Sequence, residues 1–166
     1  MEKEILLKEL KQAFEKSKQE LKFNAMFEEL EELFFLEDMA LSDKFISPRF
    51  PRQMINRMVD GIYSWAGLLH PWTMPPAYDM IYSNENKQIS EEERKEIMQM
   101  IADIMYIVRK NKRIAFEENN KEDEGKFIDE ILKFEKEKFV PFLIKFHKKF
   151  EDFWEKTDLQ DVPKGQ

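Results

Sequence analysis

Residues that break helices are scarce and unevenly placed in this sequence of 166 residues. There are four glycines and seven prolines, and five of the prolines fall between residues 45 and 83. Proline lacks an amide donor and clashes with the carbonyl one turn earlier, and glycine weakens a helix through its backbone freedom. The long stretches on either side of this segment contain few such residues, which favours long helices there.

Apolar residues recur at helical spacing in the N-terminal stretch. A stripe that begins with Leu6, Leu10 and Phe14 predicts a first helix over residues 2–40. The stripe jumps by two residues near Asn24, a step that helical spacing does not provide. We therefore expect either a bend at Asn24 or a second half that buries a different face.

Two more long helices are predicted after residue 90. Ser90 and Glu93 form a capping box, which predicts a helix over residues 91–116. Apolar residues surround most of this helix, so we expect it to be the most buried one. The last stripe runs from Phe127 to Phe153.

Two local signals modify the last helix. Asn119 and Glu122 are expected to cap its start. Pro141 lies inside its stripe and predicts a kink, or a new helix that starts near Val140, because the bond to the Glu137 carbonyl is lost.

The fold class predicted from these patterns is all-α. We expect a helical bundle of three long helices plus a shorter helical insertion that is rich in proline and aromatic residues. A chain of this length is typical of one domain, so residues 1–157 are predicted to form a single domain. Residues 158–166 are predicted to be a frayed C-terminal tail.

Composition excludes several kinds of site and partner. The absence of cysteine rules out disulfides, thiolate metal sites and a cysteine nucleophile. The net charge of −7 argues against nucleic acid as a partner. No apolar run approaches the roughly 20 residues that cross a bilayer, and the charged N-terminus does not resemble a signal peptide. We therefore expect a cytoplasmic protein without a membrane partner.

Known metal motifs are not completed in this chain. Neither histidine forms the Glu-x-x-His pair of di-iron helical bundles. Glu28, Glu29 and Glu32 match the first half of the magnesium motif of all-helical nucleotide pyrophosphohydrolases, but the required Glu-x-x-Asp does not follow. The sequence therefore predicts no metal site and no cofactor.

The middle segment is also predicted to be partly helical. Pro51 can open a helix that ends by Leu69 or His70, because Pro71 disfavours helical geometry in the residue before it. Thr73 is expected to cap a short helix that starts at Pro75 or Pro76 and ends in a turn over residues 83–86.

Residues 45–83 form the candidate site because their composition differs from that of the rest. Lysine greatly outnumbers arginine in the chain, yet half of the arginines fall within nine residues of this segment. Arginine presents a planar fork that binds carboxylates and phosphates and stacks on aromatic rings, which lysine does not do. The candidate partner- or ligand-binding residues are Arg49, Arg52, Arg57, Trp65, His70, Trp72, Tyr78 and Asp79.

Three hypotheses account for this segment. The leading one is a non-enzymatic bundle that presents it to a protein partner, because Tyr, Trp and Arg dominate binding hot spots. The alternative is a small anionic-ligand-binding protein or an enzyme, in which Arg49 and Arg52 hold the anion and His70 and Asp79 transfer protons. In a purely structural interpretation, the arginines pair with acids of residues 28–32 and the tryptophans cover the bundle.

A homodimer is also expected from the composition. The chain contains 15 phenylalanines, and the helix over residues 91–116 is apolar on nearly all sides. Three long helices would not hide this much apolar surface internally, so a second copy is expected to cover part of it.

Overall fold

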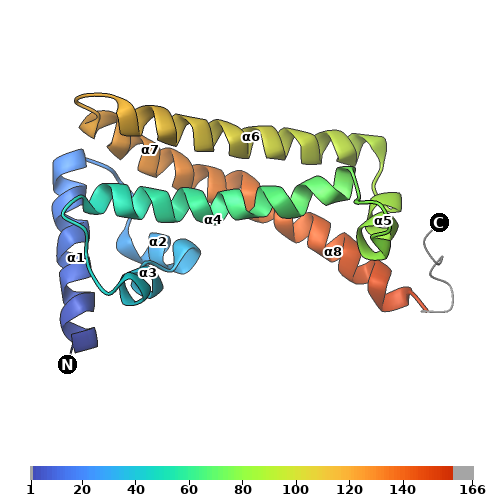
Figure 1. Ribbon diagram of the computed structural model, residues 1–166, viewed down its shortest axis with the longest axis horizontal. Coiled ribbons are helices and arrows are strands. Elements are labelled where there is room, and N and C mark those ends of the chain that lie inside the picture. Colours follow the sequence, from blue (N-terminus) through green and yellow to red (C-terminus); the bar gives the residue numbers. More distant parts are fainter. Residues whose placement is uncertain (1, 159–166) are drawn as a thin grey trace. The chain divides into compact units, whose positions relative to one another are not determined.

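The computed structural model describes residues 2–158, and every regular element in that range is helical. No helix within it is long and apolar enough to cross a lipid bilayer. The all-α class is confirmed, whereas the bundle of three long helices is not. Residues 159–166 of the predicted tail lie outside the described range. The elements, shown in Figure 1, are α1 (Glu2–Leu21), α2 (Phe27–Phe34), α3 (Leu36–Asp43), α4 (Phe50–Thr73), α5 (Met80–Lys87), α6 (Glu91–Phe116), α7 (Lys121–Phe134), the π-helical segment η1 (Glu135–Phe139) and α8 (Val140–Lys156).

The chain divides into two compact units. Unit 1 comprises Met1–Ile62 and Ile107–Phe134, and unit 2 comprises Tyr63–Tyr106 and Glu135–Gln166. The chain passes between the units inside α4, inside α6 and between α7 and η1. Because two helices continue through both units, we keep a single domain over residues 1–157 as a proposal.

The predicted first helix over residues 2–40 is wrong, because the chain breaks twice within it. The first break lies at the predicted place and is held by α7 of unit 1. The Asp129 carboxylate accepts hydrogen bonds from the backbone amides of Asn24 at 2.9 and 3.0 Å and of Ala25 at 2.9 Å. A Cβ atom at Gly125 would lie 2.1 Å from the Leu21 carbonyl oxygen, so α7 approaches the end of α1 only because residue 125 is glycine.

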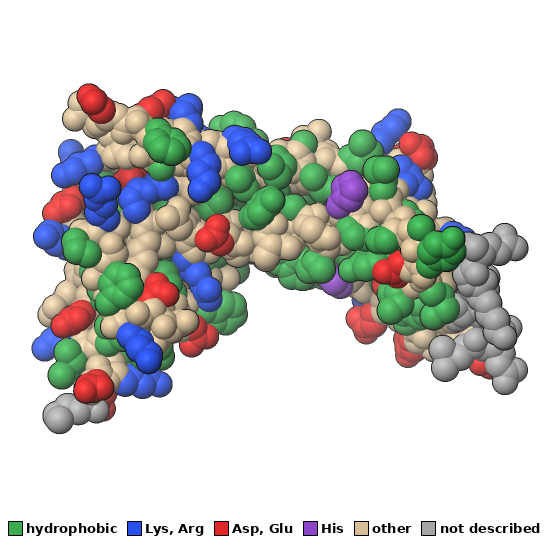
Figure 2. All heavy atoms as spheres, viewed as in Figure 1, with side chains coloured by type: hydrophobic (Ala, Val, Ile, Leu, Met, Phe, Trp, Pro, Cys, Tyr) green, Lys and Arg blue, Asp and Glu red, His purple; other side chains and the backbone are tan. Residues whose placement is uncertain are grey.

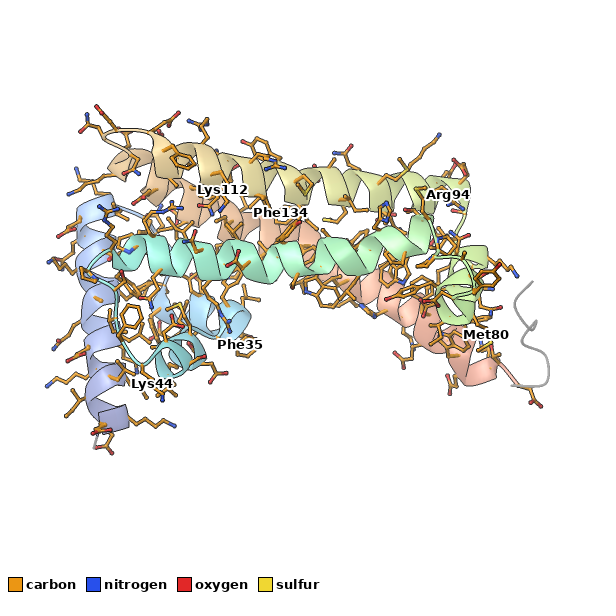
Figure 3. All side chains as sticks on the ribbon, in the orientation of Figure 1. Phe35, Lys44, Met80, Arg94, Lys112 and Phe134 are labelled. Carbon is orange, nitrogen blue, oxygen red and sulfur yellow. The ribbon has the colours of Figure 1, made fainter. Side chains whose placement is uncertain are left out.

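The second break, at Phe35, is not marked in the sequence by a nearby glycine or proline. Phe35 has a positive φ of 54° and separates α2 from α3 (Figure 3). Lys44 ends α3 in the same left-handed conformation, with a φ of 61°. The Phe35 ring is exposed while the neighbouring Phe34 and Leu36 are buried. Arg57 of α4 donates from Nε to the Phe34 carbonyl at 2.9 Å. Tertiary contacts therefore stabilise a backbone conformation that is unfavourable for phenylalanine.

The core of unit 1 is built on α1, which packs on α3 and α7. Phe14 is almost fully buried, and its ring meets Phe23 and Phe27 edge to face at centroid distances of 5.5 and 5.4 Å. Such aromatic pairs add to the stability that burial itself provides. The α1 stripe that the sequence shows is thus the face buried in unit 1.

In unit 2, α8 supplies an aromatic face to the core. Phe142, Phe146 and Phe150 are buried. α8 begins at Val140, which confirms the new helix start predicted from Pro141, and the preceding turn widens into a π-helix. Proline cannot donate to the carbonyl four residues earlier, which accounts for a change of helical winding at this point.

The start of α6 confirms the predicted capping box. The Ser90 hydroxyl accepts from the Glu93 amide, and the Glu93 carboxylate accepts from the Ser90 amide, both at 3.1 Å. α6 is not the most buried helix, however. α7 buries half of its 14 residues, whereas α6 leaves Met98 and Tyr106 more than half exposed. The predicted cap of the last helix is also wrong, since Asn119 has a φ of 55° and α7 begins two residues later.

The helices of the middle segment have different limits from those predicted. α4 continues through Pro71 to Thr73, and side chains of the next helices bind its last carbonyls. Asn86 donates to the Trp72 carbonyl at 2.5 Å, and Arg94, at the start of α6, donates to that of Thr73 at 2.6 Å (Figure 3). α5 starts only at Met80 and is capped by Asp79 rather than by Thr73.

Glu135, the first residue of the π-helix, is a buried carboxyl group. Only 8% of its surface is exposed, and no described group bonds its Oε2 atom. Burial raises its pKa from 4.5 to about 7. Because the folded-state pKa lies above the unfolded one, Glu135 carries no charge-burial cost below pH 4.5 and destabilises the fold increasingly as the pH rises to about 7.

We predict that Glu135→Gln stabilises the protein at pH 8 and has little effect at pH 4. The rise in the pKa of Glu135 corresponds to about 3 kcal/mol in the free energy of unfolding, since one pKa unit equals about 1.4 kcal/mol. Urea unfolding of both proteins from pH 4 to pH 8 measures the difference. An equal difference at all pH values would contradict the assignment of the raised pKa to Glu135.

Candidate functional site

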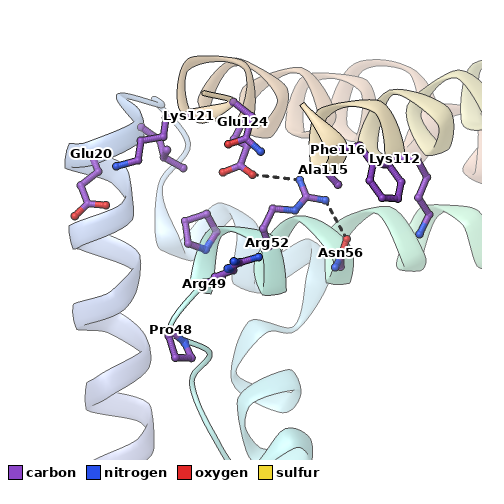
Figure 4. Close-up of a pocket in the computed structure, with 13 residues that line it drawn as sticks. Glu20, Pro48, Arg49, Arg52, Asn56, Lys112, Ala115, Phe116, Lys121 and Glu124 are labelled. Carbon is purple, nitrogen blue, oxygen red and sulfur yellow. Dashed lines mark hydrogen bonds and ion pairs between the residues drawn. The ribbon is translucent and has the colours of Figure 1, made fainter. Parts of the chain in front are cut away.

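A pocket of about 640 Å³ opens in unit 1, where α1, α4, α6 and α7 approach one another (Figure 4). Its walls come from the end of α1, the start of α4, the last turns of α6 and the start of α7. Arg49 and Arg52, two of the predicted site residues, both line it. The lining residues are Glu20, Leu21, Pro48, Arg49, Pro51, Arg52, Asn56, Lys112, Ala115, Phe116, Asn120, Lys121 and Glu124.

Arg52 joins the helices that form this pocket. Its guanidinium donates to Oδ1 of Asn111 in α6 at 2.5 Å, and to Oε1 of Glu124 in α7 and Oδ1 of Asn56 at 3.4 Å each. Asn111 in turn donates to Asn56 at 3.1 Å. The side chains of Arg52 and Glu124 are only 18% and 7% exposed, so this is a buried ion pair within a hydrogen-bond network.

The surroundings of Glu124 have two opposite effects on the pKa of its carboxyl group. Burial raises the pKa of this carboxyl above 4.5, and the neighbouring Arg52 guanidinium opposes that rise. The net direction is upward, so desolvation outweighs the attraction of the ion pair. Loss of Arg52 would therefore move the pKa of Glu124 further upward.

Three further cations surround the same pocket. Arg49, Lys112 and Lys121 are exposed, and none forms an ion pair with another residue in the range 2–158. The carboxylates of the lining are already engaged, because Glu124 pairs with Arg52 and Glu20 lies 4.0 Å from Lys16. The pocket is therefore a local positive region in a chain whose net charge is −7.

The pocket also has an apolar wall. Phe116, the last residue of α6, lies one turn after Lys112 and is 88% exposed. Residues four apart share one face of a helix, so the ring and the ammonium group point to the same side. Leu21 and Ala115 continue this wall. A ligand here meets both positive charge and an exposed aromatic ring.

The prediction from the sequence did not include Lys112, Lys121 and Glu124, which complete the lining of this pocket. Lys112 belongs to a basic cluster at the end of α6, where positive charge complements the helix dipole without any ligand. Lys121 and Glu124 lie in a charged helix start. Nothing in the pattern indicates that these residues face Arg49, which lies more than 60 positions earlier in the chain.

The other predicted site residues lie elsewhere. Arg57 binds the Phe34 carbonyl in unit 1. The purely structural interpretation expected the arginines to pair with acids of residues 28–32, but neither Arg57 nor Arg52 does so. In unit 2, His70 is exposed, and Tyr78 is 91% exposed with a φ of 67°. Trp65, Trp72 and Asp79 line a second pocket, which is in unit 2. Within residues 2–158, no three acidic or histidine side chains are grouped so as to hold a metal ion.

We predict that Arg52→Gln lowers the free energy of unfolding by about 3 kcal/mol, because it leaves the buried Glu124 without its cation. Arg49→Gln is the matched control and should change stability by less than about 0.5 kcal/mol, as exposed substitutions do. Chemical denaturation at pH 7 measures both values. Equal losses in the two variants would show that the Arg52 network does not hold the helices together.

Comparison with known proteins identifies no relative of this chain. No protein family matches it, and neither a curated protein nor a solved structure matches it significantly. What bears on its function is therefore the chemistry of the two pockets.

Proposed function

We propose that the protein binds a small organic anion in the unit 1 pocket. The observation that carries this proposal is the set of three cations, Arg49, Lys112 and Lys121, that surround the cavity and form no ion pair within 4.0 Å among the described residues, although Lys121 also attracts the Glu124 carboxylate. A carboxylate or phosphate group supplies the missing negative charge, and arginine can bind either one through two parallel hydrogen bonds.

Arg52 has a different role from its neighbour Arg49 in this proposal. Its guanidinium is committed to Asn56, Asn111 and Glu124, so it positions the walls of the pocket. Arg49 has no such commitment and is the residue that we assign to direct contact with the ligand. Lys112 and Lys121 attract the anion from the opposite wall.

The apolar wall narrows the class of ligand. Phe116 offers an exposed ring next to Lys112, and a ring or aliphatic group of the ligand can cover it. Burying that ring against a ligand removes apolar surface from water, which favours binding. We therefore propose an anion with an attached apolar group rather than inorganic phosphate alone.

Binding without catalysis fits the lining best. The pocket includes no serine, threonine, histidine or tyrosine, and its buried carboxylate is tied to Arg52. His70 and Asp79, expected as proton-transfer partners, belong to unit 2. We propose a binding protein that uses no metal or cofactor, in a cytoplasmic setting.

A titration with phenyl phosphate tests the proposal, with inorganic phosphate and phenol as its two halves. We expect phenyl phosphate to bind most tightly, and its affinity to fall as salt screens the charges. Arg49→Gln should weaken binding about tenfold, the equivalent of about 1.4 kcal/mol and within the range of a charge-assisted hydrogen bond. Isothermal titration calorimetry measures these affinities.

Lys87→Gln is the control for net charge. Lys87 is an exposed lysine of α5 in unit 2, so its loss changes the total charge by the same amount outside the pocket. It should leave the affinity unchanged. The proposal is wrong if phenyl phosphate does not bind, or if Lys87→Gln and Arg49→Gln weaken it equally.

Interaction with a protein is the second candidate function, and apolar exposure in unit 2 favours it. Tyr63, Leu68, Met74 and Tyr78 of the middle segment are each at least 45% exposed. Green side chains gather at the surface around α5 in Figure 2. We propose that a second copy of the chain covers this surface, as the composition suggests.

Light scattering across a range of protein concentrations checks the dimer. We expect a molar mass near twice the 20.2 kDa of one chain. Replacing Tyr78, the most exposed of these side chains, with Ser should shift the equilibrium towards the monomer, because apolar surface drives most association. A mass of one chain at all concentrations would remove the dimer.

A further inference from the structure

The second pocket, in unit 2, has the opposite chemistry to the first. It has a volume of about 270 Å³ and is lined by side chains of α4, α5 and α8 and by the residue that caps α5. Four of its lining side chains are the aromatic rings of Trp65, Trp72, Tyr82 and Phe150. No lysine or arginine lines it.

The rings of this pocket are held in place by their neighbours. Trp72 is buried and packs on Phe150 with a centroid distance of 4.8 Å. His147 lies between the two tryptophans, with its ring 5.7 Å from Trp65 and 5.5 Å from Trp72. Trp65 also meets Phe139 edge to face at 6.2 Å. The pocket wall therefore consists largely of rings that pack on one another.

Two carboxylates complete the lining. Glu85 accepts from the indole nitrogen of Trp72 at 2.9 Å through one oxygen and from that of Trp154 at 3.0 Å through the other. Asp79 accepts from the Tyr82 amide at 3.0 Å as the cap of α5. Neither acid forms an ion pair with a lysine or arginine in the described range. Both negative charges therefore lack a neutralising partner there.

We propose that this pocket binds a methylated ammonium group, such as the head of choline or the side chain of trimethyllysine. Aromatic faces attract cations through their quadrupoles, and quaternary ammonium groups are bound by cages of such rings. The methyl groups pack against the apolar side chains of the pocket, and the carboxylates of Asp79 and Glu85 balance the positive charge of the ammonium group. A bare ammonium ion needs several hydrogen-bond acceptors, and this lining is mainly apolar.

This inference is independent of the anion pocket of unit 1. The two sites use different residues and opposite charges, so the same ligand group cannot serve both. It also assigns a ligand to Trp65 and Trp72, and it gives Asp79 a role other than the proton transfer expected from the sequence. In this pocket the negative charge of Asp79 lies in the same lining as the aromatic rings of Trp65 and Trp72.

Tryptophan fluorescence is a direct test, because two of the three tryptophans line the pocket. We expect tetramethylammonium and choline to change the emission in a saturable manner. The alcohol 3,3-dimethylbutan-1-ol has the shape of choline without its charge and should bind at least tenfold more weakly. Equal binding of choline and this alcohol would show an apolar pocket and overturn the proposal.

Asp79→Asn separates charge from structure at this site. Asparagine caps helices as well as aspartate does, so α5 should keep its start and the melting temperature should change little. We expect at least a fivefold loss of choline affinity. Asp60→Asn removes the same charge from an exposed position of α4 in unit 1 and should bind as the parent does. Unchanged affinity in Asp79→Asn overturns the proposal.

A comparison of free choline, trimethyllysine and lysine identifies the source of the group. Tighter binding of choline indicates a small molecule, and tighter binding of trimethyllysine indicates a protein side chain. Both results support the proposal, whereas lysine that binds as tightly as trimethyllysine would overturn it. Trp65→Leu keeps an apolar wall without the ring face and should weaken binding of every methylated probe.

Discussion

The buried guanidinium of Arg52 is the contact on which the arrangement of unit 1 depends. It binds Asn111 of α6 and Glu124 of α7 from the first turn of α4, so three helices meet at one side chain. A buried ion pair contributes little net stability, but removing one partner is costly. The interaction therefore fixes how the helices meet, and the pocket walls follow from that arrangement.

The two pockets share an origin in the middle segment, whose residue types change along its length. Its first part places Arg49 and Arg52 in unit 1, and its second part places Trp65, Trp72 and Asp79 in unit 2. α4 runs through both as one helix. The unusual composition of residues 45–83 thus contributes arginines to one pocket and aromatic and acidic side chains to another.

Much of the helical content was predictable from the sequence because it depends on local chemistry. The Ser90 capping box and the new start near Pro141 follow from bonds that form within one turn. The breaks at residues 22–26 and at Phe35 were harder, since Asp129 and Arg57 hold them from distant helices. The residues that line the pocket together with Arg49 were likewise not predictable, because periodicity shows which face of a helix is apolar but not which residues lie opposite that face.

The arginines of this segment cannot be treated as one group. Arg57 binds a backbone carbonyl and Arg52 a buried network, whereas the Arg49 side chain bonds no described residue. A double replacement of Arg49 and Arg52 by lysine would therefore mix two effects. Lysine cannot reproduce the planar fork that reaches Asn111 and Glu124 together, so the fold would be disturbed along with any ligand contact. Only a change at Arg49 alone separates recognition from packing, and this follows from burial rather than from residue type.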